Sequence, residues 1–295
     1  MPSQSQPAVT YLQKCRELLA LVENQHEYIE RAADWFAETI LAGRMVHLFG
    51  SGHSRILVEE MWPRYGSFPG FNPIVELSMT FHNPVVGANG QRQAMFIENV
   101  SGLAERILRN FVLSPKDSAL VISSSGCNAV PIEMAAGFKQ RGVKVVAIIT
   151  AKHAAASTSK HPSHKKLSDF ADLVLDTGAP VGDAMVRVEG LEFPVSPGST
   201  VGGCLIVNAI KAEVAARLTA AGKPPKVLTA SSLIGAEKSN TVFEAAYDEH
   251  AYRLGKLYEG FRENIVRAQS GNAKGTISMP DDFDAPLEDF KEYIE

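Results

Sequence analysis

The chain has 295 residues, of which 45% are hydrophobic and 21% charged, and its formal net charge is -4 at pH 7. This length suits one large α/β domain with extensions, or two small domains. The slightly acidic balance argues against a protein that holds nucleic acid on a basic surface, so a small molecule is the better expected partner.

The number and spacing of the cysteines and the lack of a long apolar run indicate the cellular compartment of the protein. Cys15, Cys127 and Cys204 are odd in number and far apart, which implies no disulfide framework and fits a reducing environment. No apolar run is long enough to span a bilayer, and MPSQSQPAV lacks the features of a signal peptide. We therefore expect a cytoplasmic protein without membrane or nucleic-acid partners.

Hydrophobic periodicity divides the chain into three parts. Residues 1–43 repeat apolar positions at helical spacing and are expected to form a helical extension of one long or two short helices. Residues 44–222 alternate helical patterns with five short apolar runs, at 45–49, 72–77, 119–122, 144–150 and 172–176. This alternation is typical of a three-layer, flavodoxin-like α/β domain with a five-stranded parallel sheet of order 2-1-3-4-5.

Residues 223–295 are expected to form a C-terminal helical extension and an acidic tail. The chain becomes polar beyond Gly255 and ends PDDFDAPLEDFKEYIE. Four apolar residues of this tail nevertheless fall near one helical face: Phe283, Leu287, Phe290 and Ile294. Disorder and a docked tail helix are both compatible with this pattern.

Two turns of similar composition follow the first and third predicted strands. The stretch 45–54, MVHLFGSGHS, ends in Ser51, Gly52, His53 and Ser54; the stretch 119–128, ALVISSSGCN, ends in Ser123, Ser124, Ser125, Gly126, Cys127 and Asn128. A Ser/Gly turn that leads into a helix offers hydroxyls, close backbone approach and unpaired helix N–H groups to an anion. Because strands one and three are neighbours in the expected order, both turns should meet at one crevice.

A nucleotide site is the first rival for these turns. A dinucleotide fingerprint would need glycine where this chain has Arg55, and no Gly-Lys-Ser/Thr of a P-loop is present. A plain flexible turn capped by Asn128 is the second rival. The pairing of two such turns favours a phosphate-binding site over both.

The motifs FGSGHS, SSSGCN and TGAPVGDA resemble the SIS (sugar isomerase) domain of phosphosugar isomerases and phosphosugar-binding proteins, over about Glu30 to Leu218. The likeness is greatest to bacterial sugar-isomerase-domain proteins with a similar Gly-His-Ser turn. The resemblance implies a sugar phosphate whose phosphate lies on the second serine turn. It also implies a homodimer or homotetramer in which neighbouring subunits share the site.

Glu60 is the expected catalytic base. Moving hydrogen between adjacent carbons of an aldose and a ketose requires a base with a raised pKa, and Glu60 borders the apolar stripe of Ile56 and Leu57. The stretch LVEEMWPRYG also resembles the helix of heptose-phosphate isomerases whose second glutamate is catalytic, which corresponds to Glu60. The metal-binding histidine of that branch is replaced by Ile56, so we expect no metal and no cofactor.

His53 is the second expected catalytic residue, as an acid and base that opens the sugar ring. Glu98 is a further candidate carboxylate, while His82 and His250 could reach a neighbouring subunit's site. We expect a solvated basic loop around His153, His161 and His164 and a packing role for Cys127.

An aldose–ketose isomerase of a phosphorylated sugar or aminosugar is the leading functional hypothesis. A sugar-phosphate lyase, etherase or deaminase could use the same turns and carboxylate. A non-catalytic sugar-phosphate sensor also stays open, although the residues before Gly43 leave no room for the DNA-binding domain that such sensors usually carry.

Overall fold

Five parallel strands form the central sheet, and their order is 2-1-3-4-5, as predicted. The computed structural model describes residues 6–80 and 90–264. The strands of this sheet are β1 (Val46–Gly50), β2 (Phe71–Ile74), β3 (Ser118–Ile122), β4 (Lys144–Ile149) and β5 (Leu173–Asp176). Two further short strands, β6 (Ala184–Val186) and β7 (Val195–Pro197), pair as an antiparallel hairpin that the sequence did not predict.

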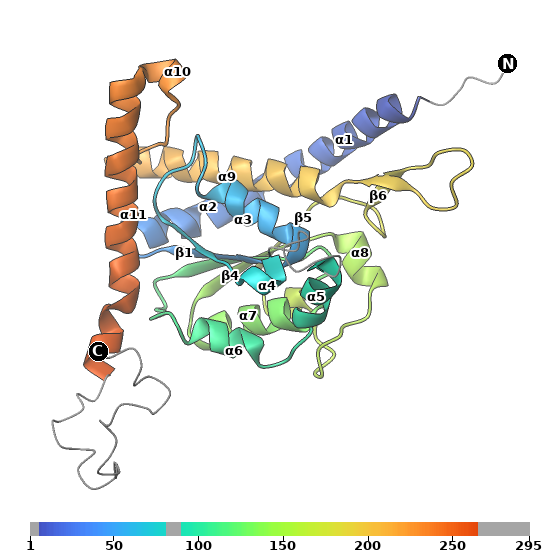
Figure 1. Cartoon of the computed structure of the whole chain (residues 1–295), viewed down its shortest axis with the longest axis horizontal. Coiled ribbons are helices and arrows are strands. Elements are labelled where there is room, and N and C mark those ends of the chain that lie inside the picture. The colour runs from blue at the N-terminus through green and yellow to red at the C-terminus, as the bar shows by residue number, and fades with distance from the viewer. Residues whose placement is uncertain (1–5, 81–89, 265–295) are drawn as a thin grey trace, which may run out of the picture. The chain divides into compact units, whose positions relative to one another are not determined.

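Helices cover both faces of the sheet (Figure 1). Before β3 they are α1 (Pro7–Glu23), α2 (His26–Leu41), α3 (Arg55–Met61), α4 (Leu77–Thr80), α5 (Gly90–Ile97) and α6 (Leu103–Leu108). After β3 they are α7 (Ala129–Gln140), α8 (Ala151–Ala156), α9 (Ser199–Ala220), α10 (Ser231–Ile234) and α11 (Ala236–Asn264). The N-terminal extension is thus two helices, and one compact unit extends to Tyr258 while a second begins at Glu259. The expected tail helix at Phe283–Ile294 lies outside the described residues.

Alternate residues of each central strand enter two separate hydrophobic cores, because successive side chains of a strand point to opposite faces. On β3, Leu120 and Ile122 pack with α2, α3 and α9, whereas Ala119 and Val121 pack with α6 and α7. The helix after β1 and the helix after β3 therefore lie on opposite faces. This is the arrangement that opens a crevice at the carboxyl ends of these two strands.

Helix α9 is buried in its middle and crosses the first core against α2, α3 and α1. Two glycines allow the close approach of its first turns. A Cβ on Gly202 would lie 2.1 Å from the carbonyl oxygen of Thr177, and a Cβ on Gly203 would lie 2.2 Å from Leu57. The glycine at 202 is needed because the obstacle there is backbone, which cannot rotate away.

Replacing Gly202 by alanine should lower the free energy of unfolding by about 2–3 kcal/mol, as overpacking in a core does. Urea denaturation measures this difference. Gly255→Ala is the matched control, because nothing lies within 4 Å of its Cβ and alanine is the better helix former within α11. Equal stability of the Gly202→Ala variant and the wild type would show that α9 does not contact Thr177 this closely.

Candidate functional site

The two Ser/Gly turns meet at one cavity, at the carboxyl ends of β1 and β3. These strands pair in parallel with Gly50 opposite Ile122, so the residues that follow each strand emerge side by side. The cavity has a volume of about 640 Å³. Eight of the sequence-predicted residues line it: Ser51, Gly52, His53, Ser54, Ser123, Ser124, Ser125 and Asn128. The predicted convergence of the turns is therefore present in a single protomer.

Gly126 sets the backbone conformation of the second turn but does not line the cavity. Its φ of +62° belongs to the left-handed region that favours glycine, and its N–H donates to the carbonyl oxygen of Ser123 at 3.1 Å. The carbonyl oxygen of Gly126 in turn accepts the N–H of Leu167 at 2.8 Å. Hydrogen bonds of the N–H and of the carbonyl group of Gly126 thus fix the turn, and this holds the hydroxyls of Ser123–Ser125 in the cavity wall.

A chain of hydroxyl groups lies behind this turn. Ser124 Oγ is 3.0 Å from Thr150 Oγ1, which is 2.7 Å from Thr177 Oγ1. Thr150 and Thr177 are buried at the ends of β4 and β5, so the sheet itself positions the serine. Hydroxyls both donate and accept, and such a chain can reorient to donate to an anion without moving atoms.

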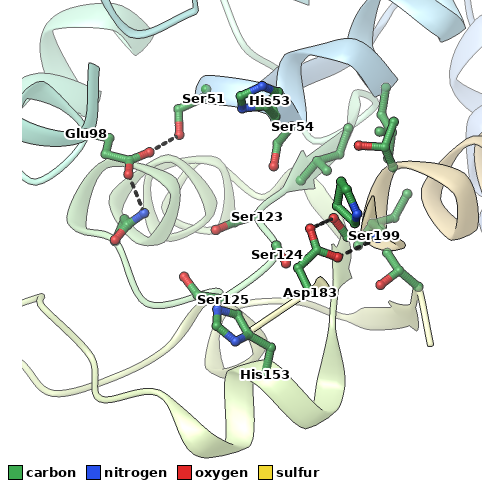
Figure 2. A pocket seen from close by; sticks show the side chains of 18 of the residues that line it. Ser51, His53, Ser54, Glu98, Ser123, Ser124, Ser125, His153, Asp183 and Ser199 are labelled. Carbon is green, nitrogen blue, oxygen red and sulfur yellow. Dashed lines mark hydrogen bonds between the residues drawn. The ribbon is translucent and has the colours of Figure 1, made fainter. Parts of the chain in front are cut away.

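Glu98 joins the two turns. Its carboxylate accepts a hydrogen bond from Ser51 Oγ at 2.6 Å and another from Asn128 Nδ2 at 2.7 Å (Figure 2). Burial raises the pKa of Glu98 above its ordinary value, although the Ser51 hydrogen bond and the charge of Lys160 oppose the change. A carboxylate with a raised pKa, held beside both serine turns, is suited to accept and return a proton.

The cavity lining also contains His153, Asp183 and Ser199, which the sequence did not assign to the site. Asp183 Oδ1 accepts the backbone N–H groups of Gly198 and Ser199 at 3.1 and 2.7 Å, and its Oδ2 accepts the Ser199 hydroxyl at 2.8 Å. Asp183 thereby caps the first turn of α9, where a carboxylate suits the helix dipole. His153 was expected in a solvated loop, but α8 places it at the cavity wall.

Glu60 does not line this cavity. It lies on α3 beside α9, where Asn208 Nδ2 donates to its carboxylate at 2.9 Å and Arg64 forms an ion pair with it. Partial burial favours the protonated form, but the hydrogen bonds from Asn208 and Arg64 outweigh it, and the pKa of Glu60 lies below its ordinary value. The expectation of a raised pKa at Glu60 is wrong, because the sequence did not show these partners.

The remaining candidates lie elsewhere. His250 packs its ring 4.9 Å from that of Trp62, in a second cavity, and burial lowers its pKa. His161 pairs with Glu133 at 3.4 Å, away from the cavity lining. Cys127 is buried and burial raises the pKa of its thiol, which suits a packing residue. The prediction for His82 lies outside the described residues.

Charged side chains are unevenly distributed in the cavity. The lining residues between 6–80 and 90–264 include the carboxylates Glu98 and Asp183 but no lysine or arginine. An anion there would depend on hydroxyls, backbone N–H groups and the histidines His53 and His153. Among the same described residues, no group of three or more His, Cys, Asp or Glu side chains could hold a metal ion.

The sheet order and the paired serine turns agree with an SIS domain, and the SIS domain family model matches residues 10–150. The chain belongs to the UPF0309 family. It is 34% identical over 248 residues to a UPF0309 protein of Geobacillus sp. (strain WCH70), covering 83% of this chain and 98% of the relative. It is 31% identical to one of Listeria monocytogenes, covering 81% and 95%. A second model, DUF2281, matches residues 259–293.

The solved structures that resemble this chain are more distant in sequence. Phosphoheptose isomerase GmhA from Neisseria gonorrhoeae is 14% identical with a TM-score of 0.43, and the match covers 72% of this chain and 97% of that one. The NanR protein of Vibrio vulnificus, solved with ManNAc-6P, is 14% identical with a TM-score of 0.39, covering 90% and 72%. Within residues 6–80 and 90–264, no helix is both long and apolar enough to cross a membrane.

Proposed function

We propose that the protein binds a sugar phosphate and interconverts its aldose and ketose forms. Membership of the SIS family and the meeting of two serine turns at one cavity support the binding of a phosphorylated sugar. The phosphate is placed on Ser123, Ser124 and Ser125, and the sugar extends toward Ser51 and Glu98. The single observation that carries the enzymatic part is Glu98, a carboxylate with a raised pKa that lines the same cavity.

Glu98 replaces Glu60 as our proposed base. In the proposed reaction its carboxylate takes the proton from the carbon next to the carbonyl group. The electron pair of the broken C–H bond forms a C=C bond, and the π electrons of the carbonyl group move to its oxygen, which gives an enediolate. The proton of the neighbouring hydroxyl group then passes to that oxygen, which leaves the charge on the oxygen that becomes the new carbonyl group. The protonated Glu98 then returns the proton to the neighbouring carbon. Ser51 and Asn128, which hydrogen-bond the carboxylate, hold it in one orientation for both transfers. His53 remains our proposed ring-opening residue.

The family's shared sites lead us to propose a homodimer or homotetramer in which a neighbouring subunit completes the cavity. We retain the domain limits predicted from the sequence, with the phosphosugar-binding domain at residues 44–222, and a cytoplasmic location as parts of this proposal.

Sugar phosphates should raise the apparent stability of the protein, whereas the parent sugars should not. At a concentration of 100 times Kd a ligand adds about 2.7 kcal/mol to the free energy of unfolding, which shifts the Tm of a domain of this size by roughly 5–11 °C. A thermal-shift screen of sugar phosphates, each paired with its unphosphorylated sugar, measures this. Equal shifts from both members of every pair would reject phosphate as the anchor.

The reaction class is tested on the best ligand of that screen by NMR in deuterated water. An isomerase incorporates solvent deuterium at a carbon without loss of a group, because Glu98 exchanges its proton with solvent between the two transfers. A lyase or etherase would release a fragment, and a deaminase would release ammonia. Binding without any of these changes would identify a sensor.

A further inference from the structure

His153 has one ring nitrogen committed to the protein backbone. The N–H of Gly182 donates to Nδ1 of His153 at 3.1 Å. A nitrogen that accepts a hydrogen bond keeps its lone pair, so this contact assigns the proton of the neutral ring to Nε2. If Nδ1 also carried a proton, its N–H would point at the N–H of Gly182, and two donors would face each other. In its neutral form His153 therefore has one donor, Nε2–H, left for another partner.

The side chain of His153 lies at the end of the cavity that the second serine turn forms. His153 lies beside Ser125, on the side of the serine turn away from Glu98 (Figure 2). Ser125 Oγ accepts the N–H of Cys127 at 3.3 Å, which leaves the hydrogen of its hydroxyl for a different acceptor. Two donors of separate elements, the second serine turn and α8, thus occupy neighbouring positions in the wall.

Uncharged hydrogen-bond donors such as His153 Nε2–H are important here because of the charges in the described lining of the cavity. Its described lining has no lysine or arginine, and the oxygens of Asp183 are already occupied by Gly198 and Ser199. An anion in this cavity is consequently held by uncharged donors, and the number of these donors sets its affinity. A fixed imidazole N–H costs little to orient, because the bond to Gly182 has already set the ring.

We propose that His153 is a phosphate-binding residue, which donates its Nε2–H to a phosphate oxygen of a ligand held on Ser123–Ser125. The proposal rests on the proposed function in one respect, that the ligand is a phosphomonoester. A hydrogen bond to a charged group is worth about a 10- to 100-fold change in Kd. Removing the His153 side chain should weaken phosphate binding by this factor.

Calorimetric titration with inorganic phosphate and with fructose 6-phosphate tests this in four proteins: the wild type, His153→Ala, His153→Gln and His164→Asn. We expect His153→Ala to raise Kd for both probes by about 10- to 100-fold. His153→Gln should restore most of the affinity, because an amide can accept from Gly182 and donate to phosphate. His164→Asn is the matched control, since His164 is exposed and its φ of +59° suits asparagine.

The outcomes separate this proposal from the proposed function. Equal affinity of the wild type and His153→Ala overturns the role of His153 alone, whereas failure of the wild type to bind either probe overturns both. Weaker phosphate binding by His153→Ala supports His153 even if no sugar phosphate is converted.

The ring itself gives a readout that a merely structural histidine would not move. In ¹⁵N NMR spectra the neutral ring of His153 should carry its proton on Nε2, and addition of inorganic phosphate should shift that nitrogen. A proton on Nδ1 of the neutral ring, or a resonance unmoved by saturating phosphate, would overturn the proposal, even if His153→Ala is too unstable to titrate.

Discussion

Glu98→Gln should lower kcat by about 10²–10⁴-fold, the usual contribution of a general base, with little change in the affinity for the sugar phosphate. Glutamine keeps the shape of the side chain and can still pair with Ser51 and Asn128, but it cannot take a proton from carbon. The variant should also be at least as stable as the wild type at pH 7, because it removes a charge whose burial is unfavourable. Steady-state kinetics of both directions, with binding measured separately, check this.

Glu60→Gln is the matched control for Glu98→Gln. Its carboxylate has partners in Asn208 and Arg64 and lies outside the cavity lining, so the change should leave kcat within a small factor of the wild type. The opposite pattern, an inactive Glu60→Gln and an active Glu98→Gln, would reject Glu98 and indicate that Glu60 enters the site of a neighbouring subunit.

The pH dependence of the reaction provides a second check on Glu98. A base acts in its ionised form, so kcat/KM should fall as the pH drops through the pKa of Glu98, which lies above the value of about 4.3 for an unperturbed glutamate. Lys160 lowers this pKa by its charge. Removal of that charge in Lys160→Gln should therefore move the acid limb to higher pH, while Lys152→Gln should not move it.

The sheet could be predicted from sequence because each of its strands has a recognisable local pattern. Each of β1, β3 and β4 is a short apolar run covered on both faces, and each ends at a polar turn. The chain order of such runs and the rules of parallel sheets leave few topologies. The eight lining residues that we predicted on the two turns follow directly, because all of them stand within six residues of a strand end.

The other residues of the site lie on segments without such a signal. Glu98, which the sequence offered only as a further candidate carboxylate, follows a loop-rich stretch, and only the folded chain shows that it reaches Ser51 and Asn128 from the end of α5. His153 lies in a run of lysines, histidines and alanines that is typical of a solvated loop, and its bond to Gly182 joins residues 29 positions apart. The positions of Glu98 and His153 depend on long-range contacts of single polar side chains. Hydrophobic periodicity in the sequence does not indicate such contacts.

A buried polar network under β1 should have a large effect on stability. Asp117 is fully buried and accepts two hydrogen bonds from Arg44, at 2.6 and 2.8 Å, and one from the N–H of Ser114 at 2.7 Å. Nε2 of His47 lies 3.5 Å away, and Nδ1 of His47 is 3.0 Å from Asn72 Nδ2. The network thus joins β1, β2 and the start of β3, on which the two serine turns depend.

Asp117→Ala should lower the free energy of unfolding by about 3–5 kcal/mol, because it leaves the guanidinium of Arg44 largely buried without its counter-charge. Urea denaturation at pH 7 measures the loss. Glu38→Ala, which breaks the exposed pair with Lys144, is the matched control and should cost no more than about 1 kcal/mol. A loss at Asp117 as small as that at Glu38 would mean that the network adds nothing beyond a surface ion pair.

The pKa of Asp117 in this network predicts how the difference in stability between the wild type and an Asp117 variant depends on pH. Burial opposes ionisation of Asp117, but the hydrogen bonds and charges of His47 and Arg44 prevail and hold its pKa below the ordinary value. The pKa in the folded state is therefore lower than in the unfolded state, so the stabilisation is complete above the unfolded pKa of about 3.9 and is lost as the pH falls through the folded pKa. The gap in stability between the wild type and Asp117→Asn should narrow below about pH 4. A gap that stays constant from pH 7 to pH 3 would show that packing, and not the charge of Asp117, accounts for it.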